Sequence, residues 1–363
     1  MARNDVPLRE LIFDDIDRSK LGEAYRRDLR DIYRFYLTEE QRERLASMGP
    51  LKRFFWIASW LSRNLLRRLS PSRRLLLVAG LFLFLFRVNI DEPKWQLNLD
   101  TSRLAVLPVL VVLMLELKDK LLARDEIEVA RQVQLSLLPT SQPSIPGWDV
   151  WSATTPANDV GGDLIDYLDG AAGRTGVALG DVAGKGMGAA LLCAKLQATL
   201  RALAPVAPDL RALGTSLNGV LARTGLDNRY ATLFYAEIAP GSDELRYLNA
   251  GHNPALLVTN GTIEPLSASA LPLGMLPGTA YAQGVATLRA GDSLILYSDG
   301  ITEATDSEGQ EYGLARLKDA VRSVASLPAE AAARRIIEDA GRFCRGEKPG
   351  DDQSILVLRR TGA

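Results

Sequence analysis

Three patterns of hydrophobic and polar residues follow one another along the chain, and each predicts a different kind of segment. In residues 6–48, apolar side chains recur every three or four positions among charged residues, which predicts polar helices. Residues 75–86 and 104–115 are apolar runs, each of twelve residues without a charge. Beyond residue 147, short apolar and alternating runs are typical of β-strands. The chain is therefore expected to have a helical first third and a β-rich remainder.

The β-rich remainder also contains helical stretches, and their order indicates the fold class. Strands are predicted at 150–153, 163–168, 176–179, 232–238, 244–248, 255–258, 293–297 and 354–358. Helices are predicted at 188–203, 210–223, 314–325 and 328–344. Many strands with helices that cover them indicate an α+β sandwich.

The first 120 residues combine positive charge with apolar runs, which indicates a membrane surface. Aromatic and basic residues are interleaved in residues 52–68, as in a helix that lies on an anionic membrane. Both apolar runs are shorter than the ~20 residues that cross a bilayer. Basic residues flank them as in a hairpin with both ends cytoplasmic: Arg67, Arg68, Arg73 and Arg74 before the first, Lys118 and Lys120 after the second. We expect a protein at the cell membrane with its β-rich domain in the cytoplasm; two buried helices of a cytoplasmic protein are the alternative.

A charged helix is predicted to join the apolar runs to the β-rich domain. From Glu116 to Leu137 its apolar residues fall at three- and four-residue spacing, and Pro139 ends it. The chain is thus divided into a helical N-terminal region (1–50), a basic amphipathic helix with two short hydrophobic segments (51–120), a helical linker (121–146) and the β-rich domain (147–360). The linker can serve as a signalling lever, an inert spacer or the seam of a homodimer, and the pattern does not choose.

Composition excludes several kinds of partner and site. With 43 basic and 44 acidic residues, the net charge of −1 makes no electrostatic case for nucleic acid as a partner. His252 is the one histidine, so a site that needs two imidazole ligands is excluded. Cys193 and Cys344 are far apart and match no metal-binding spacing. The carboxylates are the remaining candidates for chemistry.

Acidic residues stand beside glycine at the ends of several predicted strands. They are Asp163, Asp181, Asp299 and the pair Asp351 and Asp352. Mg²⁺ and Mn²⁺ prefer carboxylate and water oxygens, and glycine leaves space for a hydrated ion. Asp299 with Gly300 alone has a simpler interpretation as a turn, because Asp-Gly pairs commonly form turns, and Asp351 with Asp352 alone as a solvated loop. Asp163, between a glycine and an apolar strand, has no obvious turn role. Aspartates gathered in one cleft would repel one another, so a metal ion is their natural counter-charge.

The motifs around these acids resemble, in this order, the metal-dependent protein phosphatase (PPM) family, and within it the bacterial SpoIIE/RsbU-like branch. They are Val-Gly-Gly-Asp (160–163), Gly-Asp-Val-x-Gly-Lys-Gly (180–186), Ala-Gly-His (250–252), Pro-Leu-Gly (272–274), Tyr-Ser-Asp-Gly-Ile-Thr-Glu-Ala (297–304) and Asp-Asp-Gln-Ser (351–354). Residues 128–139 also resemble the helix that leads into that domain. The resemblance covers residues 125–360 and none of the first 120.

The resemblance implies two packed antiparallel sheets flanked by helices, with two Mn²⁺ or Mg²⁺ ions at one edge. The ligands carried over by motif are Asp163, Asp181, the carbonyl of Val182, Asp299 and Asp351, with Asp352 as the alternative to Asp351. Asp181 would bridge both ions, and Asp163 would hold either a metal-bound water or one ion directly. A water activated by the metals would attack the phosphorus of phosphoserine or phosphothreonine directly. By resemblance, the substrate would be a phosphorylated anti-sigma-factor antagonist or a similar small domain in a partner-switching pathway.

Two further residues have a functional and a simpler interpretation. Lys185, before a predicted helix, is either a phosphate contact or a solvated side chain. His252 either protonates the leaving serine oxygen or hydrogen-bonds a turn and supports the core. Asn158 and Asp159 stand where the family has a basic residue, so the phosphate contact there is open. Two rival functions are a catalytically silent phosphatase fold that binds a partner at the membrane, and a membrane-anchored scaffold.

Overall fold

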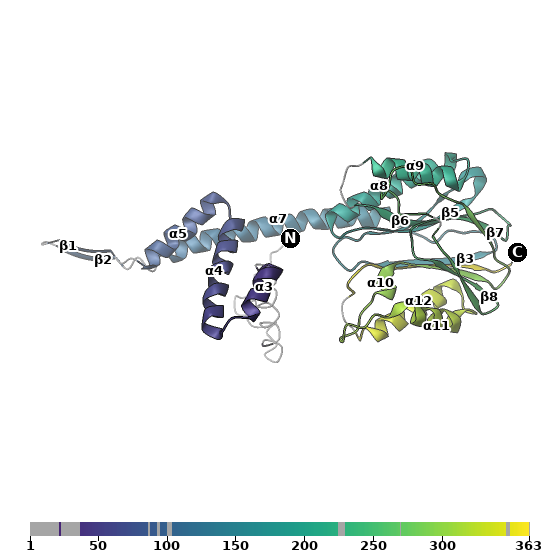
Figure 1. Cartoon of the computed structure of the whole chain (residues 1–363). Helices are drawn as coiled ribbons and strands as arrows, with labels where there is room; N and C mark the ends of the chain where they lie inside the picture. Colours follow the sequence, from purple (N-terminus) through teal and green to yellow (C-terminus); the bar gives the residue numbers. More distant parts are fainter. Residues whose placement is uncertain are drawn as a thin grey trace, which may run out of the picture. The chain divides into compact units, whose positions relative to one another are not determined.

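The computed structural model describes residues 22, 37–85, 88–92, 95–99, 104–223, 229–268, 270–345 and 349–362 (Figure 1). The helices predicted within residues 6–36 lie outside these ranges. The chain divides into two compact units, residues 1–121 and 122–363.

In the described part of the first unit, the elements are helices and one β-ribbon. The helices are α3 (Glu39–Ala46), α4 (Pro50–Arg68), α5 (Pro71–Leu85) and the first part of α7 (Val106–Leu137), which continues into the second unit. Thr38 begins α3 with a capping box, because its hydroxyl accepts from the Gln41 amide while the Gln41 side chain accepts from the Thr38 amide. Between α5 and α7, β1 (Val88–Glu92) and β2 (Trp95–Leu99) pair antiparallel. The sequence pattern did not predict this ribbon.

Within the described residues, neither apolar run of the first unit belongs to a helix that is both long and apolar enough to be a candidate membrane span. Among the described residues, one helical stretch is long and apolar enough to cross a membrane, Met187–Val206, and 44% of its most apolar window is buried. Leu192, Leu196 and Leu200 of this stretch belong to the hydrophobic core of the second unit. We therefore interpret Met187–Val206 as a core helix.

Two five-stranded antiparallel sheets form the second unit. One has the order β10-β7-β6-β5-β4 and the other β3-β12-β11-β8-β9. The strands are β3 (Trp148–Thr155), β4 (Asp163–Asp169), β5 (Thr175–Val182), β6 (Ala231–Ile238), β7 (Glu244–Ala250), β8 (Ala255–Thr259), β9 (Thr262–Leu266), β10 (Gly284–Thr287), β11 (Ser293–Tyr297) and β12 (Gln353–Arg360). All eight predicted strands are confirmed, and β9 and β10 are additional.

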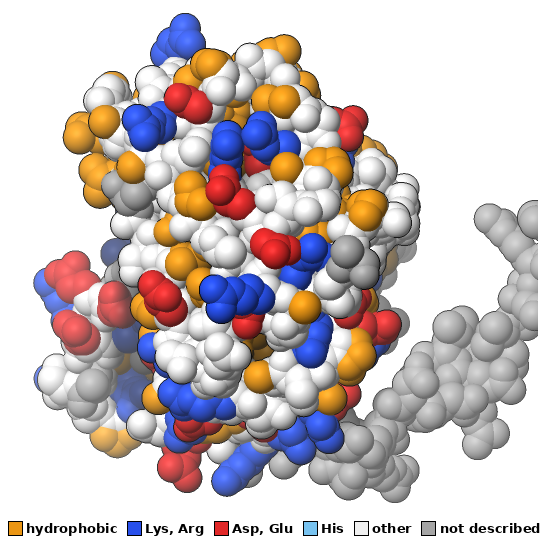
Figure 2. All heavy atoms as spheres, turned by 90° about the vertical axis from the view of Figure 1, so that its right-hand side faces the viewer, with side chains coloured by type: hydrophobic (Ala, Val, Ile, Leu, Met, Phe, Trp, Pro, Cys, Tyr) orange, Lys and Arg blue, Asp and Glu red, His pale blue; other side chains and the backbone are white. Residues whose placement is uncertain are grey.

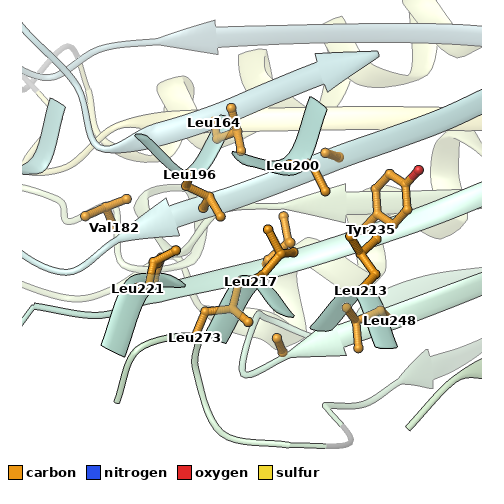
Figure 3. Close-up of a cluster of buried hydrophobic side chains, with 14 of the residues drawn as sticks. Leu164, Val182, Leu196, Leu200, Leu213, Leu217, Leu221, Tyr235, Leu248 and Leu273 are labelled. Atoms are coloured by element: carbon orange, nitrogen blue, oxygen red, sulfur yellow. The ribbon is translucent and has the colours of Figure 1, made fainter. Parts of the chain in front are cut away.

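Helices cover the outer face of each sheet, so that the unit has four layers (Figure 1). They are α8 (Met187–Leu203) and α9 (Leu210–Ala222) on one side, and α11 (Gly313–Val324) and α12 (Ala329–Phe343) on the other. These are the four predicted helices. Apolar side chains at helical spacing on α8 and α9 pack against the sheet in Figure 3. A second cluster fills the space between the sheets, and a third lies under α11 and α12.

Charged side chains of both signs are interspersed on the face of the second unit seen in Figure 2. Nucleic-acid-binding surfaces usually gather Lys and Arg on one face. This face therefore makes no electrostatic case for such a partner, in agreement with the net charge of the chain.

Candidate active site

Two of the predicted acids meet at one end of the first sheet. Asp163 is the first residue of β4, and Asp181 is the next-to-last residue of β5. The two are direct partners across the antiparallel ladder, so their backbones are adjacent. Asp163 is buried, and its Oδ2 atom has no hydrogen-bond partner among the described residues.

The other predicted acids gather at one end of the second sheet. Asp299 begins the short helix α10 (Asp299–Thr302) directly after β11, and Asp351 and Asp352 directly precede β12. These two strands are paired, with Tyr297 opposite Ile355. Ser298 fastens the two ends together: its Oγ donates to the carbonyl of Asp352 at 3.0 Å and accepts from the amide of Ser354 at 2.9 Å.

The carboxylate of Asp352 connects the two sheet ends. It accepts hydrogen bonds from the backbone amides of Ala157 at 2.7 Å, Gly162 at 2.5 Å and, more weakly, Asp163 at 3.4 Å. A side chain at position 161 would not fit, because a Cβ on Gly161 would lie 2.5 Å from Asp352 Oδ2. Asp352 therefore holds the loop that precedes Asp163. Between the two candidates for the last ligand, the geometry favours Asp351, because both oxygens of Asp352 already accept backbone hydrogen bonds.

The acids share one electrostatic environment. Burial first, and then the carboxylates of Asp299, Asp351 and Asp352, raise the pKa of Asp181 to about 7. Burial and then Asp181 raise the pKa of Asp163 well above its usual value. The pKa of Asp299 is also raised, by burial and then by Asp351. These mutual effects show that acids far apart in the sequence face a common space.

Gly162 and Val182 make this space narrow at the end of the first sheet. A Cβ on Gly162 would lie 3.1 Å from the carbonyl oxygen of Val182 and 3.3 Å from Oδ1 of Asp181. The amide of Val182 donates to the carbonyl of Gly162 at 3.3 Å. The carbonyl of Val182, predicted as a metal ligand, therefore lies beside the Asp181 carboxylate.

Among the described residues, Lys185 supplies the cation that reaches the acids. Its Nζ lies 2.9 Å from Oδ2 of Asp351 and donates to the carbonyl of Gly350 at 2.7 Å. The hydrogen bond with Asp351 is the main reason that the pKa of Lys185 is raised. More than half of the side chain is exposed (57%), so the amine remains accessible from solvent. Lys185 is thus engaged at the site rather than freely solvated.

His252 lies in the core. Its ring is buried, its Nδ1 is 2.8 Å from Oγ1 of Thr232, and its amide donates to Oδ1 of Asn249 at 2.9 Å. Burial lowers the pKa of His252 to about 4. The Thr232 hydroxyl also lies 3.3 Å from the carbonyl oxygen of Asp181. This geometry favours the core-supporting interpretation, because a proton donor for the leaving group has to be reached by substrate.

The residues fit a hard divalent cation by chemistry, although their ligand atoms are not preassembled. Across the described ranges, no three Asp, Glu, His or Cys side chains already form a metal-ligand group. The donors at hand are all oxygens, and one buried carboxylate oxygen lacks a partner among the described residues. Burial and then mutual repulsion raise the pKa of Asp181. Mg²⁺ and Mn²⁺ suit such a donor set.

Two neighbours of the site were not found from the sequence. The Gln134 side chain of α7 hydrogen-bonds both backbone groups of Gly161. Its Nε2 donates to the Gly161 carbonyl at 2.6 Å, and its Oε1 accepts from the Gly161 amide at 3.0 Å. The guanidinium of Arg229 lies over Gly188, where a Cβ would be 2.7 Å from Nη1. This Nη1 is buried and has no partner among the described residues. Gln134 lies in the segment that resembles the leading helix; for Arg229 the sequence holds no comparable signal.

Comparisons with known proteins agree with this architecture. The family model described as Stage II sporulation protein E (SpoIIE) matches residues 171–361. The phosphoserine phosphatase RsbU of Bacillus subtilis is 29% identical over 188 residues, which are 51% of this chain and 56% of RsbU. Protein IcfG of Synechocystis is 26% identical over 235 residues, which are 57% of this chain and 37% of IcfG. The chain thus spans about a third to just over half of these relatives' length.

Solved structures show the same fold. The SiaA-PP2C domain of Pseudomonas aeruginosa superposes with a TM-score of 0.58 at 20% identity and covers 66% of this chain and 98% of that domain. The RsbU and RsbW domains of Rv1364c from Mycobacterium tuberculosis superpose with a TM-score of 0.51 at 27% identity, covering 62% of this chain and 63% of that one. The second unit has a PP2C-type fold, and the chain belongs to the SpoIIE family.

Proposed function

We propose that the second unit is a metal-dependent phosphatase that hydrolyses phosphoserine or phosphothreonine on a regulatory protein. One observation carries the proposal: two sheets bring Asp163, Asp181, Asp299 and Asp351 into a common electrostatic environment, in which burial and neighbouring carboxylates raise the pKa of Asp181 to about 7. A cluster of this kind needs positive charge to be stable in its ionised form. The relationship to RsbU, whose name describes a phosphoserine phosphatase, supports the same activity.

The residues of such a site would have three different roles. Asp163, Asp181, Asp299, Asp351 and the carbonyl of Val182 would hold two Mn²⁺ or Mg²⁺ ions. When bound, the ions supply an activated water and positive charge for the phosphoryl oxygens. Asp352 holds the loop before Asp163 in place through its backbone hydrogen bonds. Lys185, released from Asp351, can offer its ammonium group to the substrate phosphate.

The substrate we propose is a phosphorylated protein domain, of the class of anti-sigma-factor antagonists. The exposed Lys185 at the site and the relationship to a phosphoserine phosphatase support a macromolecular phosphomonoester. We place the protein at the inner surface of the cell membrane, since α4 and α5 carry basic residues and exposed apolar side chains. A homodimer through the exposed Val129 and Val133 of α7 remains a prediction.

Hydrolysis assays on the full chain test the function. Wild-type protein with Mn²⁺ should hydrolyse p-nitrophenyl phosphate and a phosphoserine-bearing protein domain, and EDTA or Asp181→Asn should abolish both activities. Asp169→Asn is a matched control, because Asp169 lies at the far end of the same strand pair, opposite Thr175. Lack of turnover of every phosphoprotein tried, with Mn²⁺ and with vesicles present, would contradict the proposal. Retained binding of the phosphoprotein in that case would support the silent-module alternative.

A further inference from the structure

An apolar groove runs between α4, α5 and α7 within the first unit. Its volume is about 640 Å³. The side chains along it include Leu66 of α4, Leu77, Leu81 and Phe84 of α5, and Val109 and Leu113 of α7. Among the described residues, Ser62 is the one polar side chain of its lining. A volume of this size is in the range of ligand sites, but a lining so apolar suits a hydrocarbon rather than a polar metabolite.

Specific contacts between α5 and α7 keep the groove in shape. At one end, Arg73 pairs with Glu116 at 2.7 Å and Asp119 at 2.5 Å. Farther along, Gly80 is buried, and a Cβ there would lie 3.3 Å from the carbonyl oxygen of Ala105, directly before α7, and 3.4 Å from Cγ2 of Val109 in α7. The small residue lets the two helix backbones approach closely. The groove is therefore bounded by helices that are held together at two levels.

The helices around the groove leave an unusual amount of apolar surface in solvent. Leu75, Phe84 and Leu85 of α5 are 72%, 63% and 64% exposed, and Leu113 and Met114 of α7 are 61% and 63% exposed. Soluble monomers rarely expose large contiguous apolar areas unless these bind a partner or a membrane. The groove thus opens on a surface that itself favours an apolar environment.

Positive charge lies at one end of the groove. Leu66, which lines it, is followed by Arg67, and Leu77 lies one turn beyond Arg74. The Arg74 guanidinium donates to the carbonyls of Leu69 at 2.8 Å and Arg67 at 3.2 Å, which gathers the α4–α5 junction around it. The acids at this end, Glu116 and Asp119 of α7, both pair with Arg73. Residues 50–85 contain seven Lys and Arg and no Asp or Glu, so basic groups remain in excess there. An occupant with an anionic head and a long apolar tail would satisfy both ends.

We propose that this groove binds an acyl chain of an anionic membrane phospholipid, with the headgroup phosphate at the Arg67 and Arg74 end. Helix α5, with 15 residues, is about 22 Å long and thus shorter than a ~30 Å hydrocarbon core. The exposed aromatic residues of α4, and the neighbouring rings of its Trp56 and Trp60 with centroids 5.1 Å apart, are typical of the bilayer interface. The charge at the groove end favours a lipid over a second copy of this equally basic segment. This inference does not depend on the proposed phosphatase activity.

Two matched substitutions separate the groove from general membrane affinity. Val109→Phe adds a ring inside the groove, whereas Val111→Phe adds the same ring to a residue that does not line it, at a similar exposure of 48% and 44%. Binding of phosphatidylglycerol with a fluorescent parinaroyl chain to the full protein is measured by titration. We expect Val109→Phe to weaken this binding about tenfold and Val111→Phe to leave it unchanged. Helical circular dichroism and the urea unfolding midpoint check that both variants fold.

The charged end is tested with vesicles. Flotation of the full protein with phosphatidylcholine vesicles is compared with vesicles that also contain phosphatidylglycerol. Arg67→Gln with Arg74→Gln should reduce the preference for phosphatidylglycerol roughly fivefold per charge removed. Equal effects of the two Val→Phe substitutions, or equal wild-type binding to both vesicles, would overturn the proposal. So would a concentration-dependent dimer that Val109→Phe abolishes, because a second copy would then be the occupant.

Discussion

Asparagine substitutions at the adjacent acids Asp351 and Asp352 should affect different properties: metal affinity for Asp351 and stability for Asp352. Asp352 accepts three backbone hydrogen bonds and is buried, whereas Asp351 pairs with the exposed Lys185 and repels Asp181. The side chain of Asp352 therefore stabilises the fold, whereas the side chain of Asp351 is available to a metal ion. Both substitutions remove one negative charge from the same short segment, so the comparison isolates position from charge.

The magnitudes follow from the contacts. A hydrogen bond to a charged group contributes about 1.5–3 kcal/mol to stability, and two of the three bonds to Asp352 are short. An asparagine keeps one acceptor oxygen but turns an NH₂ group toward a backbone amide. Asp352→Asn should therefore lower the free energy of unfolding by about 2–4 kcal/mol. An exposed ion pair contributes about 0–1 kcal/mol, so Asp351→Asn should change stability by less than about 1 kcal/mol, and relief of repulsion acts in the opposite direction.

Urea unfolding in EDTA measures the stability term without metal, and Mn²⁺ titration calorimetry on the same proteins measures the ion affinity. We expect Asp352→Asn to unfold at lower urea with an unchanged slope, and Asp351→Asn to unfold as wild type but to bind Mn²⁺ at least about tenfold more weakly. An Asp352→Asn protein as stable as wild type, or an Asp351→Asn protein that is the less stable of the two, would refute the reasoning.

Three further predictions rest on single contacts. Gly161→Ala should lower the free energy of unfolding by about 1–3 kcal/mol, because its Cβ would lie 2.5 Å from Asp352 Oδ2. In the control Gly341→Ala in α12, the new Cβ meets no atom within 4 Å, so urea unfolding should show no loss of stability. The pKa of His252 is about 4 in the folded chain and about 6.5 in the unfolded chain, so the unfolded chain binds the extra proton between these pH values. The free energy of unfolding should therefore decrease by at most roughly 3 kcal/mol as the pH falls from 6.5 to 4. Urea unfolding at several pH values should show that His252→Gln lacks this pH-dependent decrease. Lys185→Met should raise the KM for a phosphopeptide roughly tenfold, with partial recovery in Lys185→Arg; an unchanged KM would remove the lysine from phosphate binding.

The strand pattern was predictable where burial alternates or is complete, and it failed where strands are exposed. β11 is buried throughout, and its apolar run marked it in the sequence. β9 is mostly exposed and carries Pro265, so it offers no apolar pattern. Its turn signal was present, since Asn260 and Gly261 have positive φ values of 49° and 77°, as an Asn-Gly hairpin turn requires. Here the turn was the better predictor than the strand.

The candidate site was predictable only where a chemically suitable side chain stands beside a residue that marks a turn of the backbone. Acids beside glycine at strand ends are visible in the sequence, and Asp163 and Asp181 prove to be cross-strand partners. The role of Asp352 could not be inferred, because its partners are backbone amides up to 195 residues away. Gln134 likewise recognises a peptide group 27 residues away and not a side chain. Backbone partners carry no residue-type signal, so such roles emerge only from the fold.

The same contacts explain how the chain tolerates so many acids in one place. Repulsion among Asp181, Asp299 and Asp351 opposes folding whenever these groups are ionised without a counter-charge. The hydrogen bonds to Asp352 and the Ser298 bridge between β11 and β12 act in the opposite direction, because they hold the loop and strand ends regardless of charge. It follows that a bound divalent cation should stabilise the second unit, and that Asp181→Asn should stabilise the metal-free protein. The two effects should not add, since the substitution removes the repulsion that the ion would relieve.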